Sequence, residues 1–182
     1  DYFTNYNETF SIEENGIDIY IPKNALYYDT FLDIEFMGDT VKVHHDDVPL
    51  HKNMTIGFDV SDIPTEEKEK MFVARLNKYG RPSYSTTYKK PTRFTTGTRS
   101  FGEYTLVSDV NPPSVRPVNF YDGQWISGNS DLKVKISDDL SGIQSFRATV
   151  NGKWILMEYE YKNNTLTHDF SDGVVSETEN DF

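Results

Sequence analysis

The chain has 182 residues, contains no cysteine and carries a formal net charge of −11. The lack of cysteine excludes a disulfide framework and cysteine-based zinc or nucleophile chemistry, and the acidic balance argues against a nucleic-acid partner. No apolar run approaches the roughly 20 residues that cross a bilayer, so we expect no membrane span in this chain.

Alternating apolar residues predict β-strands throughout the first half of the chain. Side chains at every second position lie on one face of a strand, and three runs follow this pattern: Ile17/Ile19/Ile21, Leu32/Ile34/Phe36 and Ile56/Phe58/Val60. The sequence MFVARLNKYGRP (71–82) predicts a strand followed by a turn, and a further strand is expected at 99–109. Between them, the sequence TEEKEKM predicts one short helix, with Thr65 as its N-cap and Glu66 and Glu67 near the positive end of its dipole.

The second half begins with a proline-rich stretch. Prolines at 112, 113 and 117 cannot continue a central ladder, because proline has no N–H to donate, so residues 109–117 are predicted to form a stiff linker. Strands follow at 132–136, 146–150, 154–161 and 166–170. The pair Asn151-Gly152 predicts a tight hairpin turn.

These patterns predict an all-β fold of two tandem β-sandwich domains, immunoglobulin-like or fibronectin-like, with at most one short helix. The domains are expected at 1–108 and 118–182, joined by the linker at 109–117. The opening DYFTNYNETF and the closing SETENDF both read as the interior of a longer protein. We therefore expect a fragment whose second domain is truncated at its C-terminal end.

One histidine-rich segment is a candidate metal or hydrolase site. It contains metal-ligand side chains in the sequence VHHDDVPLH, namely His44, His45, Asp46, Asp47 and His51. Adjacent side chains on a strand point to opposite faces, so His44 and His45 would not share one ion. A polar turn between strands is the favoured interpretation, and a small metal-dependent hydrolase is the alternative.

Two pairs of carboxylates have either a ligand-binding or catalytic role or a purely structural one. Asp138 and Asp139, in the sequence SDDLSG, suit a turn between strands, and the EF-hand spacing is absent. Calcium binding through these two carboxylates is the alternative. Glu158 and Glu160 lie on one strand face, and we expect this face to be solvated. A catalytic glycosidase pair is the less favoured alternative, because its two carboxylates flank a cleft.

Three aromatic residues of the second half are the remaining candidates for ligand contact. Tyr121, Trp125 and Trp154 could stack on sugar rings. Burial of both tryptophans in the second core is the favoured interpretation, because large aromatic side chains dominate core burial.

Two stretches resemble known families. The sequence NGIDIYIPKNAL (residues 15–26) resembles the opening strand of the sandwich module shared by ankyrins and netrin receptors. The Ser-Asp-Asp-x-Ser-Gly-Ile turn and the Asn-Gly-Lys-Trp hairpin lie within roughly residues 100–170. This region resembles the part downstream of the catalytic domain in bacterial lysostaphin-type zinc peptidases, above all the large envelope members of the Bacteroidetes.

The second resemblance implies a parent enzyme that cleaves peptidoglycan cross-links with one zinc ion, held by a His-x-x-x-Asp motif and a His-x-His motif. We expect neither motif here, because His44 and His45 are adjacent and His168 stands alone. The chain itself is thus expected to be no enzyme, with no catalytic residue, cofactor or bound metal.

The resulting hypothesis is a non-catalytic accessory region of a cell-envelope peptidoglycan metallopeptidase. It would position the catalytic domain, or contact the cell wall or another envelope protein, in the periplasm or at the cell surface. The alternative is an independent adhesin or carbohydrate-binding module.

Overall fold

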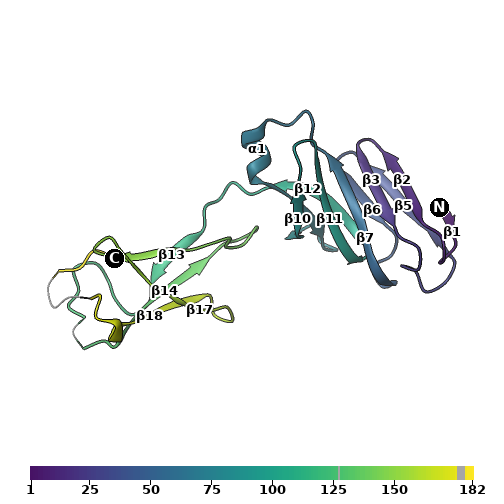
Figure 1. The fold of residues 1–182 in the computed structure, drawn as a ribbon. Coiled ribbons are helices and arrows are strands. Elements are labelled where there is room, and N and C mark those ends of the chain that lie inside the picture. The colour runs from purple at the N-terminus through teal and green to yellow at the C-terminus, as the bar shows by residue number, and fades with distance from the viewer. Residues whose placement is uncertain (127, 176–178) are drawn as a thin grey trace. The chain divides into compact units, whose positions relative to one another are not determined.

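Figure 1 presents a computed structural model of the chain, in which residues 1–126, 128–175 and 179–182 are described. The chain divides into two compact units, Asp1–Val110 and Asn111–Phe182. Among the residues that the structure describes, strands make up 49% and helices 5%, and no helix has seven or more residues. The predicted all-β class of tandem sandwiches is confirmed.

Unit 1 consists of two five-stranded antiparallel sheets and a two-stranded ribbon. The first sheet has the order β10 (Thr87–Lys89), β11 (Arg93–Ser100), β7 (Pro49–Asp59), β3 (Ile17–Ile21) and β2 (Phe10–Glu14). The second has the order β5 (Ile34–Met37), β6 (Thr40–Val43), β12 (Gly102–Ser108), β8 (Met71–Leu76) and β9 (Pro82–Tyr84). The ribbon pairs β1 (Tyr2–Thr4) with β4 (Thr30–Leu32).

The alternating side chains of both sheets meet in one hydrophobic core. Ile19 on β3 and Ile56 on β7 are directly opposite each other and fully buried, as are Val41 on β6 and Tyr104 on β12 in the other sheet. The side chains between them, such as Asp18 and Tyr20, point to the outer face. The period-two prediction therefore gives the correct inward and outward faces for these strands.

The predicted single strand through residues 32–36 is wrong, because the chain changes sheets at Asp33. β4 ends at Leu32 and pairs with β1, whereas β5 begins at Ile34 and pairs with β6. The Asp33 carbonyl accepts a hydrogen bond of 2.6 Å from the His44 N–H, and the Asp33 N–H donates to His44 Nδ1 at 3.3 Å. These bonds hold the backbone of Asp33 outside either ladder.

The single helix of unit 1, α1, covers Thr65–Lys70 and has Glu66 and Glu67 in its first turn, as predicted. The predicted N-cap is wrong. Pro64 occupies that position with an extended backbone (φ −59°, ψ 145°), and no side chain caps the helix. Thr65 is already helical, so its hydroxyl is not placed as an N-cap hydroxyl would be.

Unit 2 has a four-stranded antiparallel sheet of order β13 (Ser114–Pro117), β14 (Asp131–Ser137), β18 (Thr165–Asp169) and β17 (Glu158–Glu160). β15 (Ala148–Val150) and β16 (Lys153–Ile155) form a two-stranded ribbon, and the predicted Asn151-Gly152 turn joins them. Both turn residues have positive φ, 50° and 76°. A short 3-10 turn, η1 (Phe170–Asp172), follows β18. The core comprises Leu132, Val134, Ile136, Val150, Ile155, Met157 and Leu166.

Three details of unit 2 differ from the sequence prediction. Residues Ser114–Pro117, expected within the linker, form β13, and proline is tolerated there because β13 is an edge strand. The expected strand at 154–161 is split into β16 and β17, which pair with different neighbours. The strand expected at 146–150 begins only at Ala148.

Candidate functional site

The histidine-rich segment forms a turn between β6 and β7. His44 has a left-handed backbone with φ of 52°, so the assumption that it continues a strand is wrong. Its ring stands edge-on to Phe101, with the ring centroids 5.2 Å apart, and tilts against His45 at 5.0 Å. Burial lowers the pKa of His44, and the neighbouring His45 lowers it further. The favoured polar-turn interpretation is confirmed.

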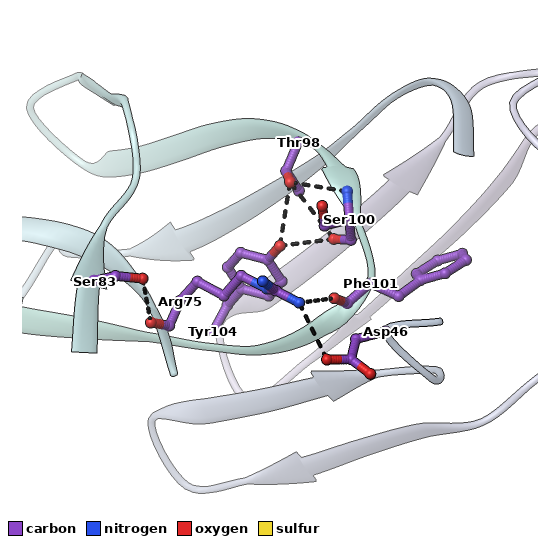
Figure 2. A network of polar contacts seen from close by, with 7 residues as sticks. All are labelled: Asp46, Arg75, Ser83, Thr98, Ser100, Phe101 and Tyr104. Carbon is purple, nitrogen blue, oxygen red and sulfur yellow. Dashed lines mark hydrogen bonds and ion pairs between the residues drawn. The ribbon is translucent and has the colours of Figure 1, made fainter. Parts of the chain in front are cut away.

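Figure 2 shows that Asp46 of this turn faces a cation. Arg75 Nη2 lies 3.5 Å from the Asp46 carboxylate and donates a 3.0 Å hydrogen bond to the Phe101 carbonyl. Arg75 therefore connects β8 to two turns of unit 1. In the described part of the chain, no three His, Asp or Glu side chains are grouped to hold a metal ion. The geometry provides no support for the hydrolase alternative at this segment.

The Asp138–Asp139 pair is part of a turn, as favoured. One carboxylate oxygen of Asp138 accepts hydrogen bonds of 2.9 Å from the N–H groups of Leu140 and Gly142. Gly142 has a φ of 85°, which is readily adopted only without a side chain. The Asp139 carboxylate accepts a 3.2 Å hydrogen bond from Asn111. Turn architecture thus accounts for the Asp138 carboxylate, and a bond from the distant Asn111 accounts for that of Asp139.

Glu158 and Glu160 are exposed on β17, an edge strand of the sheet in unit 2. Glu160 accepts a hydrogen bond of 3.1 Å from the Lys162 N–H in the following turn. Both residues belong to one three-residue strand and do not flank a cleft between two elements. The arrangement fits a solvated face rather than a glycosidase pair.

The expectation that His168 stands alone is wrong. Asp172 follows it with the His-x-x-x-Asp spacing, and His168 Nε2 lies 3.7 Å from the Asp172 carboxylate. His168 is 2% exposed, and its Nδ1 lies 3.0 Å from the Leu156 carbonyl oxygen, which ties the ring to the segment between β16 and β17.

This pair does not fit a catalytic zinc ion. Such an ion takes three protein ligands and leaves one position for water. Among residues 1–126, 128–175 and 179–182, no third histidine or carboxylate joins His168 and Asp172. The bond from Nδ1 to a backbone carbonyl is instead that of a buried histidine with a structural role.

The favoured burial of the two tryptophans is wrong. Trp125 is 84% exposed and Trp154 is 60% exposed, and Tyr121 is also exposed. On β16 the side chain of Ile155 points into the core, so its neighbour Trp154 points outward. Tyr121 and Gln124 close a small turn, in which the Tyr121 N–H donates to the Gln124 side chain at 2.9 Å. All three aromatic candidates are available for contact with a ligand.

Sequence reasoning missed an exposed aromatic surface in unit 1. Phe3 on β1 and Phe31 on β4 are directly opposite each other, with ring centroids 5.0 Å apart, and both are exposed. Tyr27 and Tyr28 are exposed just before β4. The dense aromatic content of residues 2–31 was a signal, but three-residue strands give too little periodicity to assign faces.

Sequence reasoning also missed a depression of about 410 Å³ on the outer face of the first sheet of unit 1. Its lining side chains come from β2, β3 and β11: Ser11, Ile12, Glu13, Asp18, Ile19, Tyr20 and Arg93. Asp18 and Arg93 form an ion pair across the intervening strand β7. The contact joins residues 75 positions apart, so no local pattern predicts it.

Comparison with known proteins gives one match. A family model described as a Zu5-like domain matches residues 1–109. This range agrees with unit 1, which ends at Val110. No curated protein and no solved structure matches the chain significantly. The described residues include no helix long and apolar enough to cross a membrane.

Proposed function

The chain belongs to the Zu5-like domain family through residues 1–109, and we propose that it is a non-catalytic accessory region of a cell-envelope peptidoglycan metallopeptidase. In this role it contacts the cell wall or another envelope protein and positions a catalytic domain, in the periplasm or at the cell surface. The proposal is motivated by the resemblance that the turn and hairpin sequences within roughly residues 100–170 bear to the region downstream of lysostaphin-type catalytic domains.

The exposure of Trp125 and Trp154 is the observation that carries a contact role. Tryptophan is highly buried on average, and aromatic residues are enriched where protein surfaces bind partners. Trp154 is 60% exposed although it lies beside the buried Ile155 on the same short strand. Together with Tyr121, the two tryptophans give unit 2 flat apolar surfaces on which sugar rings or side chains of a partner can pack.

An independent adhesin or carbohydrate-binding module is the second candidate function, favoured by the same exposed aromatics on a β-sandwich. The two functions differ in specificity. An accessory region needs to recognise only the wall or its own parent enzyme, whereas an independent module selects a defined glycan. A glycan array with the purified chain separates them, since one sharp glycan signal that Trp125→Ala removes supports the module.

Sedimentation with insoluble peptidoglycan sacculi tests the leading proposal. The purified chain is mixed with sacculi at low and moderate salt, and the bound fraction and the turbidity are followed in the same tube. Binding without clearing is expected. Clearing by the metal-loaded chain contradicts the non-catalytic role, and absence of binding removes wall contact and leaves only a partner protein or a spacer role.

Matched variants locate the contact. Trp125→Ala and Trp154→Ala are expected to reduce the bound fraction. Tyr79→Ala removes from unit 1 an aromatic ring whose exposure lies between those of the two tryptophans, and is expected to leave the bound fraction unchanged. Equal losses in all three variants would indicate non-specific adhesion rather than a wall-contact surface.

A further inference from the structure

The depression on the outer face of the first sheet in unit 1 brings charged, aromatic and hydroxyl side chains together in register. Ser11 on β2 is directly opposite Tyr20 on β3, and one step along the same face Glu13 is directly opposite Asp18. Arg93 reaches the same place from β11. The depression thus has a ring and a hydroxyl at one end and charged groups at the other.

The ion pair of Asp18 and Arg93 lies flat against the sheet because Gly57 has no side chain. Gly57 is on β7, directly opposite Asp18, and a Cβ built on it would lie 2.2 Å from Asp18 Oδ1 and 2.8 Å from Arg93 Nε. The side chains of Asp18 and Arg93 remain 28% and 30% exposed. The floor of the depression is therefore polar, shallow and preformed.

The charges at this end are unbalanced. Glu13 and Asp18 are carboxylates directly opposite each other on neighbouring strands, an arrangement that destabilises a sheet. Arg93 pairs with Asp18, whereas Glu13 has no hydrogen-bond or ion-pair partner among the residues that the structure describes. One additional positive group beside Glu13 would neutralise the excess negative charge.

The other end suits the face of a sugar ring. Tyr20 is 44% exposed and lies between Ser11 and Thr55 on the neighbouring strands, so hydroxyl groups flank its ring on both sides. Beyond Thr55, the same face continues over Gly97 on β11. A flat surface of small polar residues beside an aromatic ring favours a ring-shaped ligand rich in hydroxyl groups over an extended peptide. A peptide that adds a strand would pair along the outer edge of β2 rather than pack on this face.

We propose that this depression binds a glycan that carries a free amino group. The sugar ring packs on Tyr20, its hydroxyl groups bond to Ser11 and to the ion pair, and its ammonium group pairs with Glu13. The site lies in unit 1 and shares no residue with the tryptophan surfaces of unit 2, so it is independent of the proposed wall contact.

Calorimetric titration of the full 182-residue chain tests the site with three probes at mildly acidic pH, where sugar amines are protonated. The probes are a glucosamine tetramer, its fully N-acetylated form and tetralysine. The glucosamine tetramer is expected to bind about tenfold more tightly than the acetylated form, as one charge-assisted pair implies. Binding of neither sugar, equal binding of both, or tetralysine binding as tightly as the glucosamine tetramer overturns the proposal.

Two pairs of variants assign the contacts. Glu13→Gln is expected to remove the preference for the free amine, whereas Glu14→Gln, on the same exposed strand with its side chain on the other face, leaves the preference intact. Tyr20→Ala is expected to weaken both sugars, and Tyr88→Ala, also exposed, to weaken neither. Equal effects of Glu13→Gln and Glu14→Gln overturn the site, and unchanged thermal unfolding of each variant confirms that the fold is intact. Trp125→Ala is expected to leave all these affinities unchanged. The sugar site of unit 1 is therefore tested independently of whether the chain binds sacculi.

Discussion

The hydroxyl of Tyr104 donates a hydrogen bond of 2.7 Å to the carbonyl of Ser100, four residues earlier in the chain. The ring is fully buried, and the same hydroxyl lies 3.2 Å from Thr98 Oγ1 (Figure 2). Burial raises the pKa of Tyr104. The bond fixes the turn between β11 and β12, which belong to different sheets, so it links the two layers of unit 1.

Tyr104→Phe is expected to lower the free energy of unfolding of unit 1 by about 0.5–1.5 kcal/mol, because the part-buried hydrogen bond from its hydroxyl to the Ser100 carbonyl is lost. Urea unfolding, monitored by circular dichroism of the backbone, measures the change. Tyr88→Phe removes a hydroxyl from an exposed tyrosine and is the matched control. Equal stability of Tyr104→Phe and the control would show that the turn does not depend on this bond.

Gly57 and Gly97 lie on neighbouring strands of one sheet and respond differently to the addition of a methyl group. Gly57→Ala is expected to destabilise unit 1 by about 1–3 kcal/mol, since its Cβ would overlap the Asp18–Arg93 ion pair. In Gly97→Ala the nearest atom is Asn53 Nδ2 at 3.5 Å, an ordinary contact. This variant is expected to be neutral or more stable by about 0.4–1 kcal/mol. Thermal or urea unfolding of both proteins measures the difference, and equal destabilisation would contradict the flat placement of the ion pair.

The fold was predictable from the sequence wherever a strand is long enough to show its period. The alternation at 17–21 and the turn at Asn151-Gly152 identify a buried face and a hairpin without any tertiary information. The change of sheet at Asp33 was not predictable, because it depends on backbone bonds with His44, 11 residues away. The proline-containing β13 was missed because proline excludes central strands but not edge strands.

Candidate sites that depend on local sequence were predictable, and those that depend on long-range strand pairing were not. The turn at Asp138 follows from local chemistry, since a short carboxylate bonds to N–H groups two and four residues later. The exposure of Trp154 could not be read from alternation in a three-residue strand, where either face satisfies the pattern. The depression at Glu13 depends on which strands are neighbours in the sheet, and that pairing is a long-range property.

The stability of unit 1 is expected to fall as the pH decreases through the ordinary pKa of histidine, about 6.5. Burial, followed by the charge of His45, lowers the pKa of His44 in the folded state. The unfolded chain therefore binds a proton that the folded chain does not, so stability is highest above that pH and decreases below it.

His44→Asn tests this assignment, because asparagine tolerates the left-handed backbone of residue 44. The melting temperature of the wild type is expected to fall more between pH 7 and about pH 5 than that of the variant. Groups far from residue 44 contribute equally to both proteins, so the comparison reports on His44 together with the His45, Asp33 and Asp47 charges that interact with it. The same pH dependence in both proteins would mean that another group causes it.

Trp154 and Ile155 are adjacent on β16 and are expected to have opposite effects on stability and binding. Ile155→Ala should lower the free energy of unfolding of unit 2 by about 2–5 kcal/mol, because the side chain is buried in a core of seven residues. Trp154→Ala should change it by no more than about 0.5 kcal/mol, because the ring is 60% exposed. Denaturation of both variants measures these changes in stability. Sacculus binding distinguishes the two variants a second time, since only Trp154→Ala should lose binding while remaining folded.

A large loss of stability in Trp154→Ala would mean that the ring packs in solution. The wall-contact surface would then have to be sought at Tyr121 and Trp125 alone.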